Sequence, residues 1–176
     1  MIIGITGGIG AGKTLVAEIF RQLNVPVYDA DGMAKRLMNE SEDLKTKITS
    51  AFGSQSYKSN QIDRNYLAQR VFKNESDLKL LNSIVHPVVL DDFQNWCKII
   101  DNQILGIESA ILIESGFHRF VDKVLHVQAP MHLRIQRIIQ RDRVDASTAT
   151  QRIQAQLSDK ERNQYADFLL ENDGRA

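Results

Sequence analysis

The residues that most constrain the fold of this chain stand near its start, where Gly7 to Thr14 read G-G-I-G-A-G-K-T. This run fits the pattern G-x-x-x-x-G-K-[ST] in full, and its glycines permit backbone angles that turn several N–H groups toward one anion. A short apolar run, Met1 to Thr6, precedes the loop, and apolar residues at helical spacing follow it. The following helix would add its positive N-terminus. The pattern predicts a site for the phosphates of a nucleoside triphosphate.

The two side chains that close the loop are suited to phosphate and metal. A lysine such as Lys13 reaches the β- and γ-phosphates, and the hydroxyl of Thr14 is the predicted direct ligand of Mg²⁺. A glycine-rich turn that ends in Lys-Thr by chance is the alternative, and the flanking strand and helix argue against it. The predicted nucleotide contacts of the loop are Gly8, Ile9, Gly10, Ala11, Gly12, Lys13, Thr14 and Leu15.

The pattern of apolar residues predicts a parallel sheet surrounded by helices. The first strand, the loop, the first helix and a second strand at Val25 to Tyr28 form a βαβ unit, which almost always crosses over right-handed. Residues from about 31 to 100 read as helices with little strand. Further strands are expected at Ile104 to Ile107, Ile111 to Ile113, Lys123 to Val127 and Ala166 to Leu170. We therefore predict an α/β, three-layer fold with a central parallel sheet of about five strands.

Some helix boundaries can be placed from local signals. Asp63 is a predicted N-cap. A helix from about Ser76 is expected to stop at His86-Pro87, because the residue before a proline disfavours the α region. A separate helix would then run through Val89 to Ile100, and Pro130 would open a later one.

Composition excludes several classes of protein. The 22 basic and 22 acidic residues of the 176-residue chain cancel, which removes the overall attraction expected of a dedicated nucleic-acid or membrane-surface binder. A single cysteine, Cys97, excludes an intramolecular disulfide and a thiolate zinc cluster. The N-terminus lacks the features of a signal peptide, and the apolar runs are too short to span a bilayer. We expect a cytoplasmic protein without nucleic-acid or membrane partners.

Three classes of protein with such a loop compete. Asp29-Ala30-Asp31-Gly32 superficially fits the D-x-x-G pattern of a regulatory GTPase, but no N-K-x-D guanine signature occurs. A motor-type ATPase needs an apolar strand that ends in an acid pair, and Ile111-Leu112-Ile113-Glu114 ends in a single glutamate. A small-molecule kinase explains more of the sequence.

Asp29 and Asp31 follow the second predicted strand, which a parallel sheet places near the glycine loop. A carboxylate there can accept the proton of an attacking hydroxyl or orient it. Along an extended segment both side chains would point the same way. The alternative is that Asp31 caps the next helix, and one residue can do both.

Arginines recur on one face of the helix after Pro130. Arg134, Arg137 and Arg141 are spaced by three and four residues, just before a polar break at Arg143 to Ser147. On a hinged flap they could close over a triphosphate and exclude water. The alternative is an ordinary solvated helix face.

In these features the chain resembles the dephospho-coenzyme A kinase family, over nearly its whole length. The glycine loop is shared with many kinases, whereas the order of the remaining motifs is far more specific. These motifs are Val27-Tyr28-Asp29-Ala30-Asp31, Ile62-Asp63-Arg64 with Leu67 and Val71-Phe72, Leu81 through His86-Pro87, Pro130 with Arg137 and Arg141-Asp142, Arg152 to Gln156, and Ala166-Asp167 with Asn172.

The resemblance implies transfer of the γ-phosphoryl group of ATP to the 3′-hydroxyl of dephospho-coenzyme A, with Mg²⁺ as cofactor. It implies that Asp31, Lys13, Arg137 and Arg141 are catalytic and that Asn172 lies beside the ATP base. Acceptor-binding residues would be Asp31, Arg64, Arg70, His86 and Glu114. His86 alone would more often be a structural turn residue, and Glu114 could instead pair with a cation.

The resemblance also implies a division of the chain, taken as a single domain over 1–176. The core would comprise about 1–30, 103–130 and 165–176, the acceptor region about 31–102, and the lid about 137–160. We expect a monomer or a weak homo-oligomer.

The chain departs from the family pattern at two places and at its end. The P-L-L-F-E stretch of the family appears here as Ala110 to Glu114, and Asn82 replaces a glutamate that often precedes His-Pro. We also expect roughly one more helix beyond Ala176. Two alternatives stay open: another small-metabolite or nucleoside kinase of the same fold, and a nucleotide-binding module that no longer catalyses.

Overall fold

A five-stranded parallel sheet organises the first and last thirds of the chain. The computed structural model describes residues 1–174, apart from the side chains of Phe72 and Lys73. The sheet has the order β2-β5-β1-β6-β7, with every pair parallel. Its strands are β1 (Ile2–Thr6), β2 (Val27–Asp29), β5 (Leu105–Glu108), β6 (Lys123–Gln128) and β7 (Phe168–Glu171). The predicted α/β fold with about five parallel strands is confirmed.

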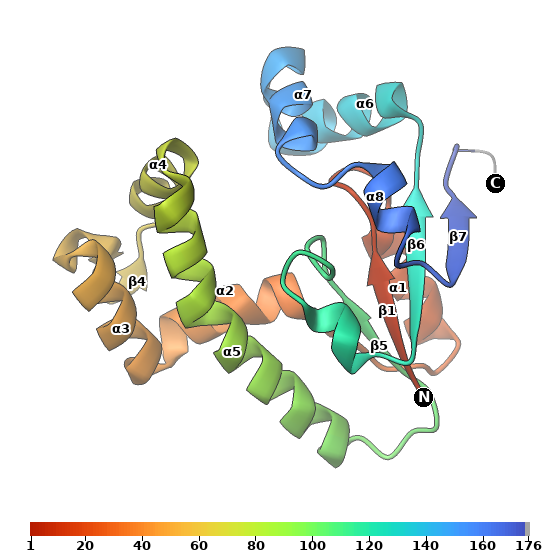
Figure 1. Cartoon of the computed structure of the whole chain (residues 1–176), viewed down its shortest axis with the longest axis horizontal. Helices are drawn as coiled ribbons and strands as arrows, with labels where there is room; N and C mark the ends of the chain where they lie inside the picture. The colour runs from red at the N-terminus through yellow and green to blue at the C-terminus, as the bar shows by residue number, and fades with distance from the viewer. Residues whose placement is uncertain (175–176) are drawn as a thin grey trace. The chain divides into compact units, whose positions relative to one another are not determined.

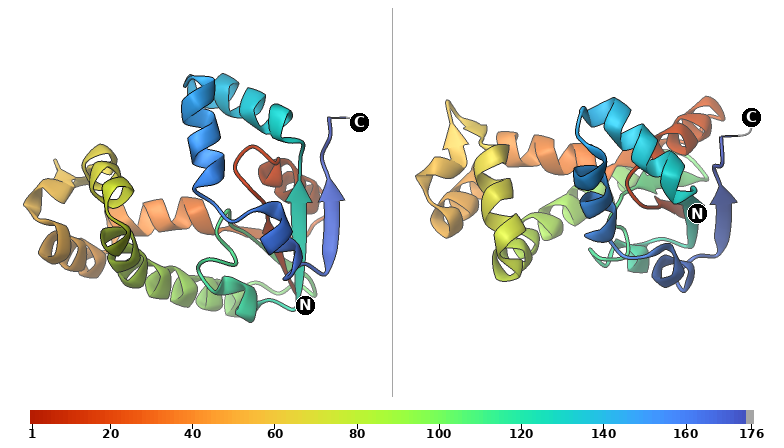
Figure 2. Two further views of the ribbon diagram at one scale, coloured as in Figure 1. Left: turned by 45° about the horizontal axis from the view of Figure 1, so that its top comes forward. Right: turned by 90° about the horizontal axis from the view of Figure 1, so that it is seen from above.

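Helices flank this sheet, as Figures 1 and 2 show. The first helix, α1, and the short helix α8 lie on opposite faces of the sheet. The helices of this part are α1 (Lys13–Gln22), η2 (Phe117–Phe120), α6 (Met131–Asp142), α7 (Ala146–Gln154) and α8 (Asp159–Asn163).

The core of this part ties the glycine loop to the sheet. Ile5 of β1 and Val127 of β6 are fully buried, and Val16 and Ala17 of α1 pack against them. Ala11, from the loop itself, belongs to the same buried cluster. Complete burial of a side chain such as Ile5 contributes about 1.5–3 kcal/mol. The loop is therefore anchored to a rigid core at its centre and at both ends.

The chain divides into two compact units. Residues Ala30–Ile100 form one unit, and Met1–Asp29 with the chain from Asp101 onward form the other. We call the second the sheet unit and the first the helical unit. No helix among the described residues is long and apolar enough to cross a membrane.

The helical unit contains four helices and one small hairpin. Its core side chains include Leu44, Ile48 and Phe52, together with Val89 and Phe93. The elements are α2 (Ala30–Glu40), α3 (Glu42–Phe52), η1 (Ser54–Ser56), β3 (Tyr57–Lys58), β4 (Gln61–Ile62), α4 (Arg64–Lys73) and α5 (Glu75–Ile99). The strands β3 and β4 pair antiparallel. Asp63 caps α4 as predicted, because its carboxylate accepts a hydrogen bond of 2.9 Å from the N–H of Tyr66.

The prediction that a helix ends at His86-Pro87 is wrong. One helix, α5, runs from Glu75 to Ile99 with Pro87 inside it. A proline in a helix lacks one N–H donor and disfavours the helical conformation of the preceding residue. Burial of Val85, Val89 and Phe93 on both sides of Pro87 offsets this cost.

The strand predicted at Ile111 to Ile113 is also absent. Residues 110–116 form a turn, in which Leu112 and Ile113 are buried although they are not in a strand. The N–H of Ser115 donates to the carbonyl of Ile111 at 2.8 Å, as in a helical turn. An apolar run this short signals burial without specifying a strand.

Candidate nucleotide-binding site

The glycine loop lies between the end of β1 and the start of α1. Gly10 and Gly12 have φ angles of 80° and 98°, in the left-handed region where glycine is favoured. Gly12 directly precedes Lys13, the first residue of α1, and the Lys13 side chain is buried. The positive end of α1 therefore begins at the residue predicted to contact the β- and γ-phosphates.

Side chains outside the loop hold three successive carbonyl groups. The carbonyl of Ile9 accepts from Arg134 Nε at 3.0 Å and that of Gly10 from Arg137 at 3.2 Å. The carbonyl of Ala11 accepts from Asn172 Nδ2 at 3.0 Å. In a trans peptide the C=O and the next N–H point in opposite directions, and the described chain has no cis peptide. The N–H groups of Gly10 and Gly12 are thus directed away from these side chains, as an anion-binding loop requires.

Two of the predicted nucleotide-site residues meet at this outer side of the loop. Arg137 donates to Asn172 Oδ1 at 3.2 Å while both residues bind loop carbonyls. Arg141, the third predicted cation, is exposed and pairs with Asp142 at 2.7 Å. The structure therefore brings Arg137 and Asn172 to the loop and separates Arg141 from them. Burial and partners thus differ among the three arginines of α6, and their closure over a triphosphate stays a prediction.

One acidic residue of the site was missed by sequence reasoning. Thr14 Oγ1 donates to Glu108 Oε1 at 2.9 Å, and Glu108 ends the apolar strand β5 beside β1. The sequence signal was Leu105-Gly106-Ile107-Glu108, an apolar strand that ends in an acid. The sequence-based prediction places the acid-ending strand at Ile111 to Glu114 instead, and the structure shows a turn there.

The residues around Thr14 fit a magnesium ion. A hydroxyl and a carboxylate are hard oxygen donors, the type that Mg²⁺ prefers, and Mg²⁺ usually keeps waters and phosphate oxygens as its other ligands. Among the described residues no group of three or more histidine, cysteine or acidic side chains forms a protein-only metal cage. The donor set suits a metal that arrives with the nucleotide.

Asp29 and Asp31 stand where β2 passes into α2. Asp29 is the last residue of β2, and Asp31 lies in the first turn of α2, since that helix begins at Ala30. The expected extended segment, which would point both side chains one way, is therefore wrong. Asp31 also lies inside the helix rather than at the residue before it, although an acid in the first turn still favours the helix dipole.

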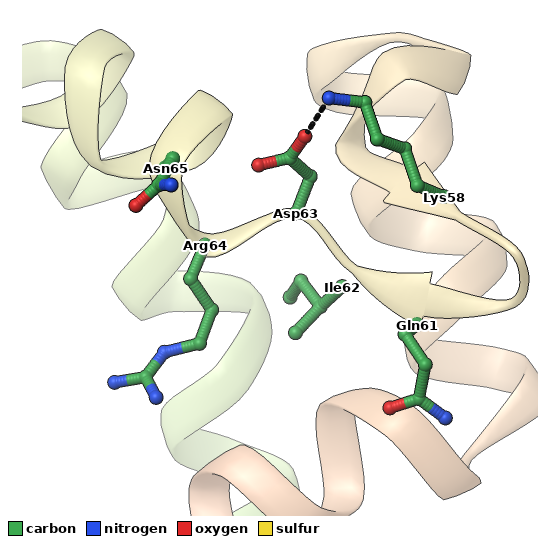
Figure 3. A pocket seen from close by; sticks show the side chains of 6 residues that line it. All are labelled: Lys58, Gln61, Ile62, Asp63, Arg64 and Asn65. Carbon is green, nitrogen blue, oxygen red and sulfur yellow. Dashed lines mark ion pairs between the residues drawn. The ribbon is translucent and has the colours of Figure 1, made fainter.

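The predicted acceptor residues of the helical unit fall in different places. Arg64 lines a cavity of about 310 Å³ at the hairpin and the start of α4. Figure 3 shows the side chains around it, with Lys58 paired to Asp63. The lining residues are Lys58, Gln61, Ile62, Asp63, Arg64 and Asn65.

Arg70 and His86 are not part of that lining. Arg70 contacts the hydroxyl of Tyr66 at 3.2 Å and Asp77 at 3.6 Å. His86 lies within α5, and burial lowers the pKa of its imidazole. It is therefore a helix residue rather than a residue of a turn.

Glu114 has a cation as its partner. Its carboxylate lies 2.9 Å from Nη2 of Arg162, a side chain that is completely buried. An ion pair with a buried arginine was one of the two roles considered for Glu114. Its contact with the acceptor stays a prediction.

The comparison with known proteins covers the whole chain. The family model described as "Dephospho-CoA kinase" matches residues 1–176. The chain belongs to the dephospho-CoA kinase family. Membership makes it a phosphotransferase that uses ATP to phosphorylate dephospho-CoA in coenzyme A biosynthesis, and the alternative kinases and the non-catalytic module are not favoured.

Individual relatives support the family. The dephospho-CoA kinase of Bacteroides fragilis is 36% identical over 173 residues, which are 98% of this chain and 84% of that protein. The dephospho-CoA kinase of Porphyromonas gingivalis is 40% identical over 154 residues, 88% of this chain and 76% of that protein.

Solved structures support the fold. The dephospho-CoA kinase of Campylobacter jejuni is 28% identical, with a TM-score of 0.70 over 99% of this chain and 89% of that one. A shikimate kinase of Acinetobacter baumannii, 18% identical with a TM-score of 0.59 over 99% of this chain and 85% of that one, shares the fold.

Proposed function

We propose that this dephospho-CoA kinase transfers the γ-phosphoryl group of Mg-ATP to the 3′-hydroxyl of the acceptor ribose. The Thr14–Glu108 contact of 2.9 Å beside the glycine loop supports the nucleotide and metal part of the proposal, and membership of the family supports the acceptor. The 3′-oxygen forms a bond to the γ-phosphorus as the bond from that phosphorus to the β–γ bridging oxygen breaks. The products are coenzyme A and ADP.

In the sheet unit, the loop and Lys13 would bind the phosphates. The N–H groups of Gly10 and Gly12 are pre-oriented by side chains on their far side, so little reorganisation accompanies binding. Arg141 is a candidate for neutralising charge during transfer, and Arg137, on α6, would first have to release the carbonyl of Gly10 that it binds behind the loop. Asn172, with the end of β7, is the candidate for contact with the base.

Thr14 would ligate the metal, and Glu108 would orient the Thr14 hydroxyl and accept from metal-bound water. When bound, Mg²⁺ would neutralise the charge that develops on the phosphate oxygens. The family's need for a divalent ion is expected, and magnesium as that ion is part of this proposal.

Asp31 is the proposed catalytic carboxylate for the acceptor hydroxyl. It follows β2 by two residues, and β2 pairs with β5, the strand that carries Glu108. A carboxylate there can accept the proton of the 3′-hydroxyl as the new bond forms. Positioning and electrostatics would supply most of the rate enhancement.

The helical unit would bind the rest of the acceptor. The cavity near Arg64 is lined by Arg64, by Lys58 paired with Asp63, and by the amide side chains of Gln61 and Asn65. Such a lining suits an anionic and hydrogen-bonding ligand. Arg70, His86 and Glu114 remain the further candidates, and the cytoplasm is the proposed location of a monomer or weak oligomer.

Release of ADP from Mg-ATP tests the proposal. Release that depends on dephospho-CoA, and that does not occur with adenosine, AMP or buffer alone, is the expected result. Release with a different acceptor would keep the kinase chemistry and overturn the acceptor assignment. Absence of release with every acceptor, while ATP still binds, would overturn the proposed catalysis.

A further inference from the structure

Behind the phosphate loop, α6, α8 and β6 of the sheet unit bring together a buried arginine, a buried histidine and a partly exposed aspartate that the proposed chemistry does not use. Arg134 is 5% exposed and His126 is completely buried, and Asp159 lies between them. We call these three residues the support cluster. The cluster matters here because the proposed function gives the loop the task of binding the phosphates.

Arg134 fills the space directly behind the loop. Its Nε donates to the carbonyl of Ile9 at 3.0 Å. A Cβ placed on Gly8 would come within 1.9 Å of Arg134 Nη2, so the guanidinium and the backbone of Gly8 are in close approach. The preceding peptide group is also held, because the N–H of Ile9 donates to Gln156 Oε1 at 2.8 Å. Any shift of Arg134 would therefore move the Gly8–Ile9 turn and the Gly10 N–H that follows it.

Asp159 holds Arg134 in this place. Its Oδ2 accepts from Arg134 Nη1 at 3.3 Å, and its Oδ1 faces His126 Nε2 at 3.4 Å. The pKa of the Asp159 carboxyl lies below its usual range, first because of the adjacent His126 ring and then because of the charge on Arg134. A buried arginine without a carboxylate partner would be costly.

His126 packs against Asp159 on the side away from Arg134, without a hydrogen bond between Nε2 and the carboxylate. Its Nδ1 lies 2.7 Å from Asn163 Oδ1, and Gln128 Nε2 lies 3.3 Å from the same Nδ1. These contacts fix the ring from β6 and α8, so that Nε2 is left facing the carboxylate. The other charges near the pair are Arg162, whose Nη1 is 4.0 Å from Asp159 Oδ1, and Glu114, which pairs with Arg162.

We propose that Asp159 and His126 are positioning residues that act through Arg134 to hold the phosphate loop in its anion-binding shape. Neither residue needs to touch the nucleotide. Their contribution is to preserve the direction of the Gly10 N–H, and so the affinity for the phosphates. If the role were purely structural, substitution of these residues would lower only the stability of the fold. In a positioning role, substitution also lowers the affinity for the nucleotide.

Four variants test this proposal: Arg134→Met, Asp159→Ala, Asp159→Asn and the double variant Arg134→Met with Asp159→Ala. The dissociation constant of Mg-ATP is measured by calorimetry, without acceptor, together with the melting temperature. Loss of one hydrogen bond to a charged group predicts a rise of about tenfold in the dissociation constant for Asp159→Ala. Asp159→Asn keeps an acceptor oxygen, so a smaller rise is expected. The double variant should bind no more weakly than Arg134→Met alone, because Asp159 acts only through Arg134.

Two control variants separate affinity from stability. Lys160→Ala changes an exposed neighbour of Asp159 on α8. Ser41→Ala removes the N-cap of α3, whose Oγ accepts from the Leu44 N–H at 3.3 Å, in the helical unit. Both should leave the dissociation constant of Mg-ATP unchanged, although Ser41→Ala lowers the melting temperature.

Backbone amide NMR gives a readout that global stability does not move. The Gly10 and Ile9 resonances should shift in nucleotide-free Asp159→Asn and stay in place in Lys160→Ala. Unchanged ATP affinity in Asp159→Ala, or additive losses in the double variant, would overturn the proposal. If Arg134→Met does not fold, His126→Gln replaces it, and unshifted Gly10 and Ile9 resonances in that variant would overturn the proposal in the same way.

These results are independent of the acceptor reaction. If the wild-type protein does not phosphorylate dephospho-CoA, and the Asp159→Ala variant binds ATP more weakly than the wild type, the proposed function is refuted and the positioning role is supported. An active wild-type protein with an unaffected Asp159→Ala variant would do the reverse.

Discussion

The two units of the chain use charged side chains in opposite ways. In the sheet unit Arg134 and Arg162 are buried, and Arg134 donates to the backbone of the phosphate loop. In the helical unit several charged pairs are exposed and lie within one helix, as in Arg36 with Glu40 and Lys47 with Asp43, and two others, Lys58 with Asp63 and Arg70 with Asp77, join neighbouring elements. Removal of one member of a buried pair is costly, whereas exposed pairs contribute little.

The buried Arg134 lies where the backbone of the phosphate loop has to keep one conformation. A phosphate loop is a set of backbone dipoles that must stay aimed at one point, and buried arginines can fix carbonyl groups for that purpose. The helical unit relies instead on apolar packing around Leu44, Ile48 and Phe93. We therefore expect substitutions in the sheet unit to change nucleotide binding, and substitutions in the helical unit to change stability or acceptor binding.

Asp31→Asn gives the largest expected effect and tests whether a residue of the helical unit acts on the acceptor without affecting nucleotide binding. The amide cannot accept the proton of the acceptor hydroxyl, so kcat should fall by about 10²- to 10⁴-fold. The dissociation constant of Mg-ATP should remain within error of the wild type, because Asp31 is proposed to act on the acceptor. Rapid-quench turnover and calorimetry measure the two quantities. Turnover close to that of the wild type would exclude the catalytic role.

Glu108→Gln tests whether the sheet unit acts on the metal as well as the phosphates. Glutamine has nearly the same size and can still accept from Thr14, but it lacks the charge. Loss of such a supporting partner typically costs about 10- to 100-fold in activity or metal affinity. The Mg²⁺ concentration for half-maximal activity should rise, whereas Glu18→Gln, at an exposed position of α1, serves as the matched control. An unchanged magnesium dependence would remove Glu108 from the metal site.

Pro87→Ala should separate stability from nucleotide binding. The substitution restores an N–H that can donate to the carbonyl of Ser83 in the middle of α5, and a proline in a helix costs about 3 kcal/mol. We expect the free energy of unfolding to rise by about 1–3 kcal/mol, with the affinity for ATP unchanged. Urea denaturation measures the change. A destabilised variant would mean that neighbouring side chains require the shape of the proline.

Asp63→Asn gives the smallest expected effect, a small loss of stability at neutral pH that disappears in acid. The pKa of Asp63 is lowered, first by the hydrogen bond to Lys58 and then by the Tyr66 N–H. A group with a depressed pKa stabilises the fold above its unfolded value of about 3.9, and this contribution is lost as the pH falls through the folded value. Melting temperatures from pH 7 to about pH 2.5 should therefore decline less steeply in the variant. Identical slopes for the two proteins would contradict the assignment.

Much of the sheet unit followed from local sequence. The strand, glycine loop and helix at the start are specified by residues within Met1 to Gln22, and β6 and α6 by periodicity and by Pro130. The cap at Asp63 was equally local. The error at Pro87 arose because the preference of a single residue was weighed without the packing of Val85, Val89 and Phe93, which no local signal reports.

The partners of the loop could not be predicted from spacing. Arg134 and Asn172 reach the loop only because β6 pairs with β1 and β7 pairs with β6 in the sheet, an arrangement that residue spacing does not report. Glu108 was missed for a related reason, since the apolar run at Ile111 to Ile113 competed for the same strand position. Glu108 is the acid that ends β5, the strand paired with β1.

The strand order also has a consequence for how this protein comes to be folded. Ile2 is in register with Leu105, and Ile3 with Lys123. The strand β1 therefore has no neighbour until β5 is available, and it is paired on both sides only when β6 is available as well. The helices of residues 30–100 meet partners that are close in sequence, and such local contacts form quickly. Closing the long loop that joins β1 to β5 carries a larger entropic cost. During synthesis the apolar strand at the start of the chain must therefore wait, exposed and unpaired, while the helical unit takes shape after it.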